Sequence, residues 1–103
     1  MGFNFRNRYH YGNTRNIPIS VVKKIFIRDK GECIYCGSPA MEIDHVVSYK
    51  EGGLTIKGNL VCVCLRCNRI KAGAKGQKKI FYITKGLFWL MQHGENTDWV
   101  DKL

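Results

Sequence analysis

Two short cysteine pairs constrain the fold of this chain more than any other feature. Cys33 and Cys36 form one Cys-x-x-Cys knuckle, and Cys64 and Cys67 form a second knuckle with the same spacing. Four thiolates in two such pairs match the ligand set of a tetrahedral structural zinc site, with Zn–S bonds of about 2.3 Å. A chain of 103 residues has a small core, to which a bound metal would add stability. The spacing therefore predicts a zinc-stapled domain.

A fifth cysteine leaves the identity of one ligand open. On a strand, Cys62 and Cys64 would point to the same side, so the sequence does not exclude Cys62 as a ligand. A free cysteine is more often a small apolar core residue. We therefore assign the ligand to Cys64.

The sequence carries no segment that would send it to or through a membrane. It contains no run of 18 apolar residues and no signal-peptide hydrophobic region. We therefore expect a cytoplasmic protein, in a bacterial or phage-infected cell. In a reducing cytosol, cysteines act as metal ligands rather than as disulfides.

The charge of the chain predicts a polyanionic partner. The formal net charge is +9, and without a lipidation motif or a basic amphipathic anchor, nucleic acid fits better than a membrane surface. Between Cys64 and Lys85 there are seven basic residues and no acidic one, which predicts a phosphate-contacting face; a solvated helix face is the alternative. The residues assigned to DNA binding on this stretch are Arg66, Arg69, Lys71, Lys75, Lys78 and Lys79.

Residues 1–18 are predicted to form a basic aromatic arm. Arginines and aromatic residues alternate there without a helical or strand period. The arm would bind DNA through Arg6 and Arg8, and a solvated tail is the alternative.

Residues 19–103 are predicted to form a single domain of the α+β class. A first helix would begin after an N-cap at Ser20 and end near Lys30-Gly31, with Gly31 at the C′ position. Its basic residues, predicted on the faces away from the apolar one, are Lys23, Lys24, Arg28 and Lys30. The predicted strands cover residues 41–47 and 59–63, with a glycine-containing loop between them, and the second knuckle opens a helix over about residues 65–71. Two strands and a helix make a ββα unit over about residues 33–75, with the zinc site at its base.

C-terminal helices are predicted over about residues 78–103. Their apolar side chains, assigned to the core, are Ile80, Phe81, Ile83, Leu87, Phe88, Leu90 and Met91. Thr97 would cap a last turn that places Trp99 against the domain.

Between the knuckles lie residues suited to a second, catalytic metal. Asp44 and Asn68 both offer oxygen atoms, which suit a hard cation such as Mg²⁺. His45 titrates near neutrality and can take a proton from an attacking water. A metal, a base and a cationic helix together predict a site that hydrolyses phosphodiester bonds.

The stretch from Cys33 to Lys71 resembles the HNH endonucleases of the ββα-metal (His-Me finger) type. The motifs that carry the resemblance are CIYCG, EIDHV, GG and NLVCVCLRCN. The resemblance implies a metal-dependent DNA endonuclease with His45 as general base. It implies that Asp44 and Asn68 hold Mg²⁺ or Mn²⁺, and that Asn59 pins the loop between the strands and so orients His45. The products would carry 5′-phosphate and 3′-hydroxyl ends, as in phage or restriction nucleases.

One letter departs from the family pattern. Asn68 stands where the third letter of the motif would be a histidine, which makes this chain a His-Asn-Asn variant. An amide oxygen still binds a metal, but an imidazole would favour Ni²⁺ or Zn²⁺ more strongly.

Two other functions remain to be compared with the nuclease. A non-catalytic zinc-stapled DNA-binding module would need no base beside two oxygen ligands. The feature that favours catalysis is the intact set Asp44, His45, Asn59 and Asn68. A redox Cys-x-x-Cys protein would need a βαβ context that the sequence lacks. A single ββα unit cuts one strand at a time, so double-strand cleavage would require two visits or a homodimer.

Overall fold

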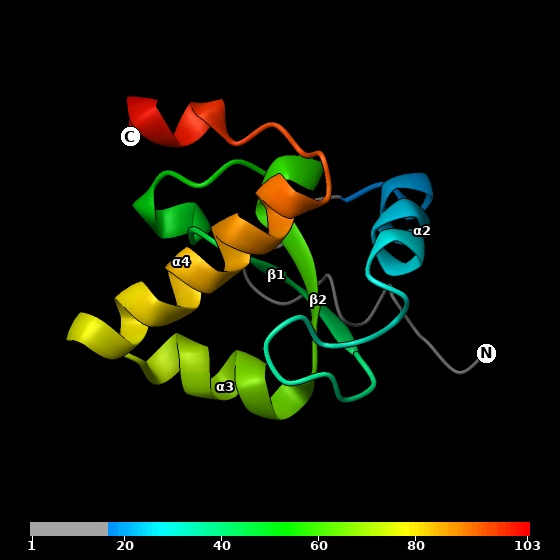
Figure 1. Cartoon of the computed structure of the whole chain (residues 1–103), viewed down its shortest axis with the longest axis horizontal. Coiled ribbons are helices and arrows are strands. Elements are labelled where there is room, and N and C mark those ends of the chain that lie inside the picture. Colours follow the sequence, from blue (N-terminus) through cyan, green and yellow to red (C-terminus); the bar gives the residue numbers. More distant parts are fainter. Residues whose placement is uncertain (1–16) are drawn as a thin grey trace.

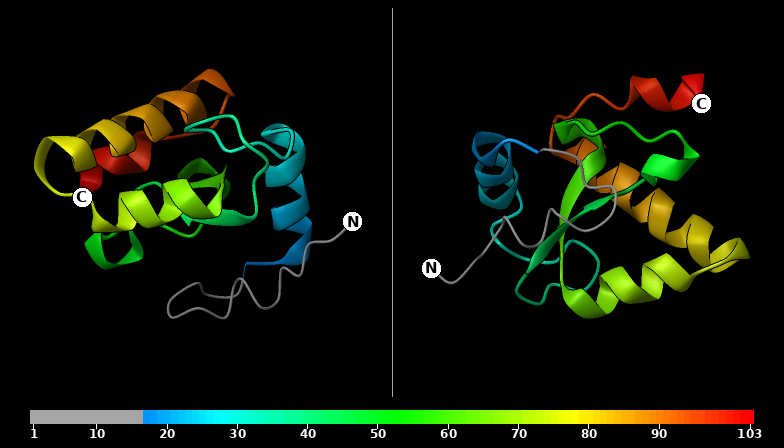
Figure 2. Two further views of the ribbon diagram at one scale, coloured as in Figure 1. Left: turned by 90° about the horizontal axis from the view of Figure 1, so that it is seen from below. Right: turned by 180° about the vertical axis from the view of Figure 1, so that it is seen from behind.

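The computed structural model describes residues 17–103, arranged around a two-stranded hairpin (Figure 1). The antiparallel strands are β1 (Glu42–His45) and β2 (Leu60–Val63). Helix α2 (Ile19–Arg28) lies on one side of the hairpin, and α3 (Leu65–Gly73) and α4 (Gly76–Gln92) lie on the other, as the view from behind in Figure 2 also shows. Short 3-10 turns are formed by η1 (Tyr49–Glu51), η2 (Lys57–Asn59) and η3 (Asp98–Lys102). The predicted α+β class and the order β1, β2, α3 are confirmed.

The division into an arm and a domain stays a prediction. Residues 1–16, with Arg6 and Arg8, lie outside the described part of the chain. In the part that is described, no helix has both the length and the apolar character needed to cross a membrane.

Strand β2 is buried on both faces, because successive side chains alternate across a strand. Leu60 and Cys62 pack in the core cluster that includes Ile25 of α2. Val61 and Val63 pack in the other cluster, which includes side chains of α4. The strands pair in register, with Asp44 opposite Val61, so Asp44 lies on the α3 and α4 side of the hairpin.

Both predicted ends of the first helix are wrong by one or more residues. The N-cap is Pro18, whose carbonyl accepts from the amides of Val21 and Val22, so Ser20 is not the cap. At the other end Lys30 has φ 57° and occupies the left-handed C′ position. Gly31 follows it and donates from its amide to Phe26 O at 2.9 Å, the 6→1 bond of a Schellman motif.

The core assignment for α4 is correct for only one of its faces. Leu90 is buried, and Ile83 and Leu87 pack partly buried against the core. The apolar side chains that lie exposed instead are Ile80, Phe81, Phe88 and Met91. Gly86 is buried on the packed face, where a Cβ atom would lie 2.7 Å from Val46 Cγ1. The glycine therefore permits close contact between α4 and the hairpin rather than merely weakening the helix.

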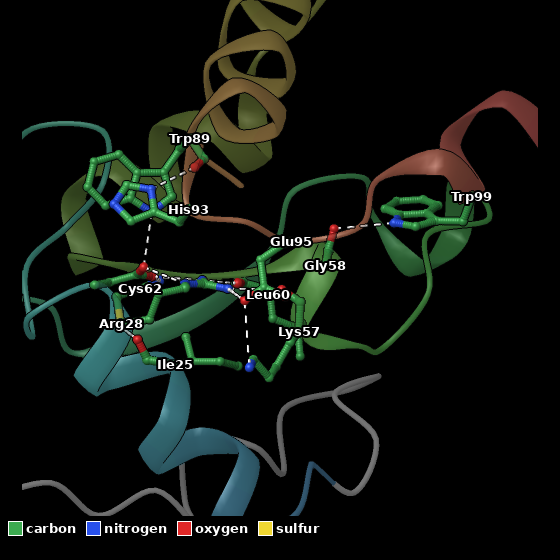
Figure 3. A network of polar contacts seen from close by, with 11 residues as sticks. Ile25, Arg28, Lys57, Gly58, Leu60, Cys62, Trp89, His93, Glu95 and Trp99 are labelled. Carbon is green, nitrogen blue, oxygen red and sulfur yellow. Dashed lines mark hydrogen bonds and ion pairs between the residues drawn. The ribbon is translucent and has the colours of Figure 1, made fainter. Parts of the chain in front are cut away.

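A network of hydrogen bonds around the Arg28–Asp29 ion pair joins the end of α2 to the rest of the domain (Figure 3). Arg28, predicted on an outer face of the helix, is only 10% exposed and donates to Asp29 Oδ1 and Oδ2 at 2.7 and 3.0 Å. Asp29 also accepts from Cys62 N and Trp89 Nε1, both at 3.0 Å. Arg28 donates in addition to the carbonyl of Leu60 at 2.6 Å. This network fixes the hairpin between α2 and α4.

The C-terminal turn packs on the loop between the strands. Trp99 donates from Nε1 to Gly58 O at 3.3 Å, as Figure 3 shows, so its predicted place against the domain is confirmed. Thr97 occupies the predicted N-cap position of η3, but its side chain makes no capping hydrogen bond.

Candidate functional site

The four cysteines of the two knuckles meet at one point. The Sγ atoms of Cys33, Cys36, Cys64 and Cys67 all lie within 4.8 Å of one another. Cys36 and Cys64 Sγ are 3.7 Å apart, which matches the edge of a tetrahedron of sulfurs about 2.3 Å from a central ion. This cluster could bind zinc.

Local hydrogen bonds act on Cys36 of the first knuckle and on Cys64 of the second. The hydrogen bond between Cys36 Sγ and Ser38 Oγ, 3.2 Å long, lowers the pKa of Cys36 to about 6, which favours the thiolate that binds metals. Cys64 is the N-cap of α3, and its sulfur accepts from Cys67 N at 3.3 Å. The second knuckle thus forms where β2 turns into α3.

Cys62 lies apart from the cluster. It is fully buried, and its Sγ atom lies 3.8 Å from Ile25 O, on the α2 side of the hairpin. Cys62 is therefore a core residue, as the sequence analysis assigned it.

Three of the four predicted catalytic residues, Asp44, His45 and Asn68, line one open pocket of about 670 Å³. Asp44 and His45 reach it from β1, and Asn68 and Lys71 reach it from α3. The other residues that line the pocket are Val46, Ser48, Tyr49, Lys50, Glu51, Ala72, Ala74, Lys79 and Ile83. A candidate base and two candidate oxygen ligands thus share one solvent-accessible space.

The imidazole of His45 is oriented by the loop between the strands. Its Nε2 atom lies 2.9 Å from Thr55 Oγ1, and its ring meets that of Tyr49 edge to face at 6.4 Å. In the tautomer that donates from Nε2 to Thr55, the basic lone pair is on Nδ1.

Asp44 is held by Lys71. Lys71 Nζ lies 2.9 Å from Asp44 Oδ2 and donates to His45 O at 3.0 Å. Burial raises the pKa of Asp44, and the Lys71 ammonium opposes that shift. Apart from this ion pair, Asp44 Oδ2 accepts no hydrogen bond from the described residues. A buried carboxylate oxygen in this state fits a cation ligand.

The side-chain amide of Asn68 on α3 is held by Glu42 of β1. Its Nδ2 atom donates to Glu42 Oε1 at 2.8 Å. Since a carboxylate can only accept, the Asn68 nitrogen must be the atom that faces Glu42. The amide oxygen is therefore the atom left for a metal ion.

Asn59 lies outside the pocket, fully buried beneath the loop. Its Nδ2 atom donates to the carbonyls of Val47 at 2.9 Å and Leu54 at 2.8 Å. Its Oδ1 atom accepts from Val47 N at 2.9 Å. These three bonds tie the start of the loop, just after His45, to the start of β2.

The basic residues predicted to bind DNA divide into two groups. Lys71 and Lys79 line the pocket and are paired with Asp44 and Glu51. Those that are exposed are Arg66 and Arg69 on α3 and Lys75 and Lys78 at the start of α4.

A sequence model of the HNH endonuclease family matches residues 33–73. This segment is similar to an HNH endonuclease domain. It contains β1, β2, α3 and all four clustered cysteines, and nucleic acid is the substrate that the family implies. A CRISPR-associated endonuclease Cas9 from Corynebacterium diphtheriae is 43% identical over 49 residues, which cover 43% of this chain and 4% of that protein. The chain thus matches only a small part of that relative's length.

Two residues of the HNH site were missed by the sequence analysis. Glu42 precedes Asp44 by two positions, so strand alternation could have placed both on the same side of β1. Thr55 lies in the loop between η1 and η2, where no periodic pattern indicates its contact with His45.

Proposed function

We propose that this chain is a metal-dependent DNA endonuclease that hydrolyses phosphodiester bonds to 5′-phosphate and 3′-hydroxyl ends. The observation that carries the proposal is the pocket that His45, Asp44 and Asn68 line together. Its location within the HNH domain supports nuclease chemistry over other hydrolytic reactions.

His45 is proposed as the general base. In the neutral tautomer that donates from Nε2 to Thr55, the Nδ1 atom would take a proton from water. Asn59 would act indirectly, because its bonds to Val47 and Leu54 fix the loop that follows His45.

Asp44 and Asn68 are proposed to hold one Mg²⁺ or Mn²⁺ ion. A carboxylate and an amide oxygen are ligands that these hard cations accept, with substrate phosphate among the remaining ligands. When bound, the ion would stabilise the charge of the pentacovalent phosphate and of the departing 3′ oxygen.

The four-cysteine cluster is proposed to hold a structural Zn²⁺ ion. Its sulfurs supply all four ligands of a closed tetrahedral site, which leaves no position for a substrate. The exposed residues Arg66, Arg69, Lys75 and Lys78 would contact DNA phosphates, with Arg6 and Arg8 adding to them.

Cleavage of supercoiled plasmid with Mg²⁺, Mn²⁺ or EDTA tests this proposal. His45→Ala should lower the nicking rate at least ~100-fold, because general-base catalysis contributes about 10²–10⁴. His93→Ala is the matched control, since His93 is exposed and stacks on Trp89 away from the pocket. Equal nicking by wild type and the His45 variant would remove His45 as the base.

The same experiment tests the alternative of a zinc-stapled DNA-binding module. Binding to plasmid without cleavage in any metal would favour that module. Linear product that forms with a second-order dependence on protein concentration would indicate a homodimer, whereas nicked circles alone would indicate a single-strand cut.

A further inference from the structure

A pair of crossed contacts joins β1 to α3 beside the proposed catalytic metal site. Glu42 and Asp44 are two residues apart on β1, while Asn68 and Lys71 are three residues apart on α3. Each element therefore presents two side chains to the other. Glu42 accepts from Asn68 at 2.8 Å, and Lys71 lies 2.9 Å from Asp44.

In both contacts a proposed metal ligand is held by a charged residue of the opposite element. Lys71 of α3 holds the carboxylate of Asp44 on β1, and Glu42 of β1 holds the amide of Asn68 on α3. The charges of Glu42 and Lys71 have opposite signs, so the two holding residues together add no net charge to the site.

An amide ligand needs such a partner more than a carboxylate does. Rotation by 180° about the last side-chain bond of Asn68 would present its NH₂ group to a cation in place of the oxygen. A carboxylate has no wrong orientation of this kind, since both of its ends are oxygen. The bond to Glu42 fixes the amide so that its oxygen is the atom left for the metal.

We propose that Glu42 is a positioning residue for the catalytic ion, which acts by holding the Asn68 oxygen toward the metal. This inference rests on the proposed function, because it requires that Asp44 and Asn68 bind the ion. Residues that hold metal ligands typically change metal affinity by about 10–100-fold when they are removed. Glu42→Ala should therefore weaken Mn²⁺ binding about 10-fold.

The test is a double-mutant cycle read out by Mn²⁺ binding to the zinc-loaded protein, measured by electron paramagnetic resonance. In the Asn68→Asp background the ligand at position 68 is a carboxylate, which needs no orientation because both of its ends are oxygen. The Glu42 carboxylate would repel this second carboxylate. Glu42→Ala should then leave Mn²⁺ affinity unchanged or increase it. Weakening by the same factor in both backgrounds would overturn the proposal, because it would indicate that Glu42 binds the metal directly.

Two further variants separate positioning from charge and from folding. Glu51→Gln removes a carboxylate that lines the pocket but contacts Lys79 and Ser48 rather than Asn68. It should change Mn²⁺ affinity less than ~2-fold, as expected for an exposed charge in high dielectric. Glu42→Gln keeps an acceptor oxygen for the Asn68 amide, and it should bind Mn²⁺ more tightly than Glu42→Ala if orientation is the cause.

Failure of this inference is distinguishable from failure of the proposed function. If Asp44→Asn leaves Mn²⁺ binding at the wild-type level, the metal site itself is wrong. If Asp44→Asn abolishes binding while Glu42→Ala leaves it unchanged, the metal site stands and the positioning role of Glu42 is wrong. Thermal melts and zinc content of each variant identify any that fail to fold.

Discussion

Replacement of Asn59 by aspartate tests the loop anchor with almost no change in shape. The variant keeps an oxygen that accepts from Val47 N, now 2.9 Å from Asn59 Oδ1. It loses both donated bonds and turns a carboxylate oxygen toward the carbonyls of Val47 and Leu54, which lie 2.9 and 2.8 Å from Nδ2. The side chain is fully buried, so water cannot screen the new contacts.

The loss in the free energy of unfolding follows from these contacts. Two lost hydrogen bonds account for about 1–3 kcal/mol, and an uncompensated buried charge brings the loss to about 3–5 kcal/mol. A small domain has a free energy of unfolding of about 5–15 kcal/mol. We therefore expect Asn59→Asp to be marginally folded at neutral pH, and to lose nuclease activity through disorder of the loop that follows His45.

Urea unfolding of zinc-loaded protein, followed by circular dichroism, measures this loss. Asn96→Asp is the matched control, because Asn96 is exposed and its side-chain oxygen only accepts, from Asp98 N at 2.8 Å. That control should stay within about 0.5 kcal/mol of wild type. If Asn59→Asp also stays within about 1 kcal/mol of wild type, the two donated bonds do not hold the loop.

Two further predictions concern the zinc cluster and the packing of α4. Cys36→Ser should lower both zinc content and melting temperature, because zinc binding in small sites is coupled to folding. Cys62→Ala should lower the melting temperature, while the zinc content measured after exhaustive dialysis stays at one ion per chain. If Cys62→Ala lost its zinc and Cys36→Ser kept it, the ligand assignment would be reversed. Gly86→Ala should cost about 1–3 kcal/mol despite its better helix propensity, because the new methyl group would lie 2.7 Å from a buried valine. Gly73→Ala, where nothing lies within 4 Å, should be neutral or stabilising in the same melts, and equal effects at both glycines would contradict the packing explanation.

The parts of the fold that the sequence predicted are those set by short-range rules. The spacing of the cysteine pairs identified all four clustered thiols, because each pair lies within a single turn. The strand predicted over residues 59–63 is confirmed by β2, and the packing of both its faces shows that it is buried. The ββα order that the sequence predicted brings His45, Asp44 and Asn68 to one pocket.

The parts that could not be predicted depend on how far long side chains reach between elements. Arg28 looked like a surface residue because its helical position is polar, yet it reaches the carbonyl of Leu60 and a buried Asp29. Lys71 fitted a phosphate contact equally well, and only the placement of α3 beside β1 shows that it contacts Asp44. The apolar residues of α4 lie around most of its circumference, so periodicity could not indicate which face packs.

The match to the HNH family covers less of the molecule than the site requires. A hairpin of two four-residue strands is marginal by itself, and it needs packing on both faces to hold a metal site. One face receives that packing from α2, through Ile25 and Asp29, and the other from α4, through Leu90. Both helices contribute residues beyond the matched segment 33–73. The motif therefore supplies the chemical groups, while α2 and α4 supply the rigidity on which their geometry depends.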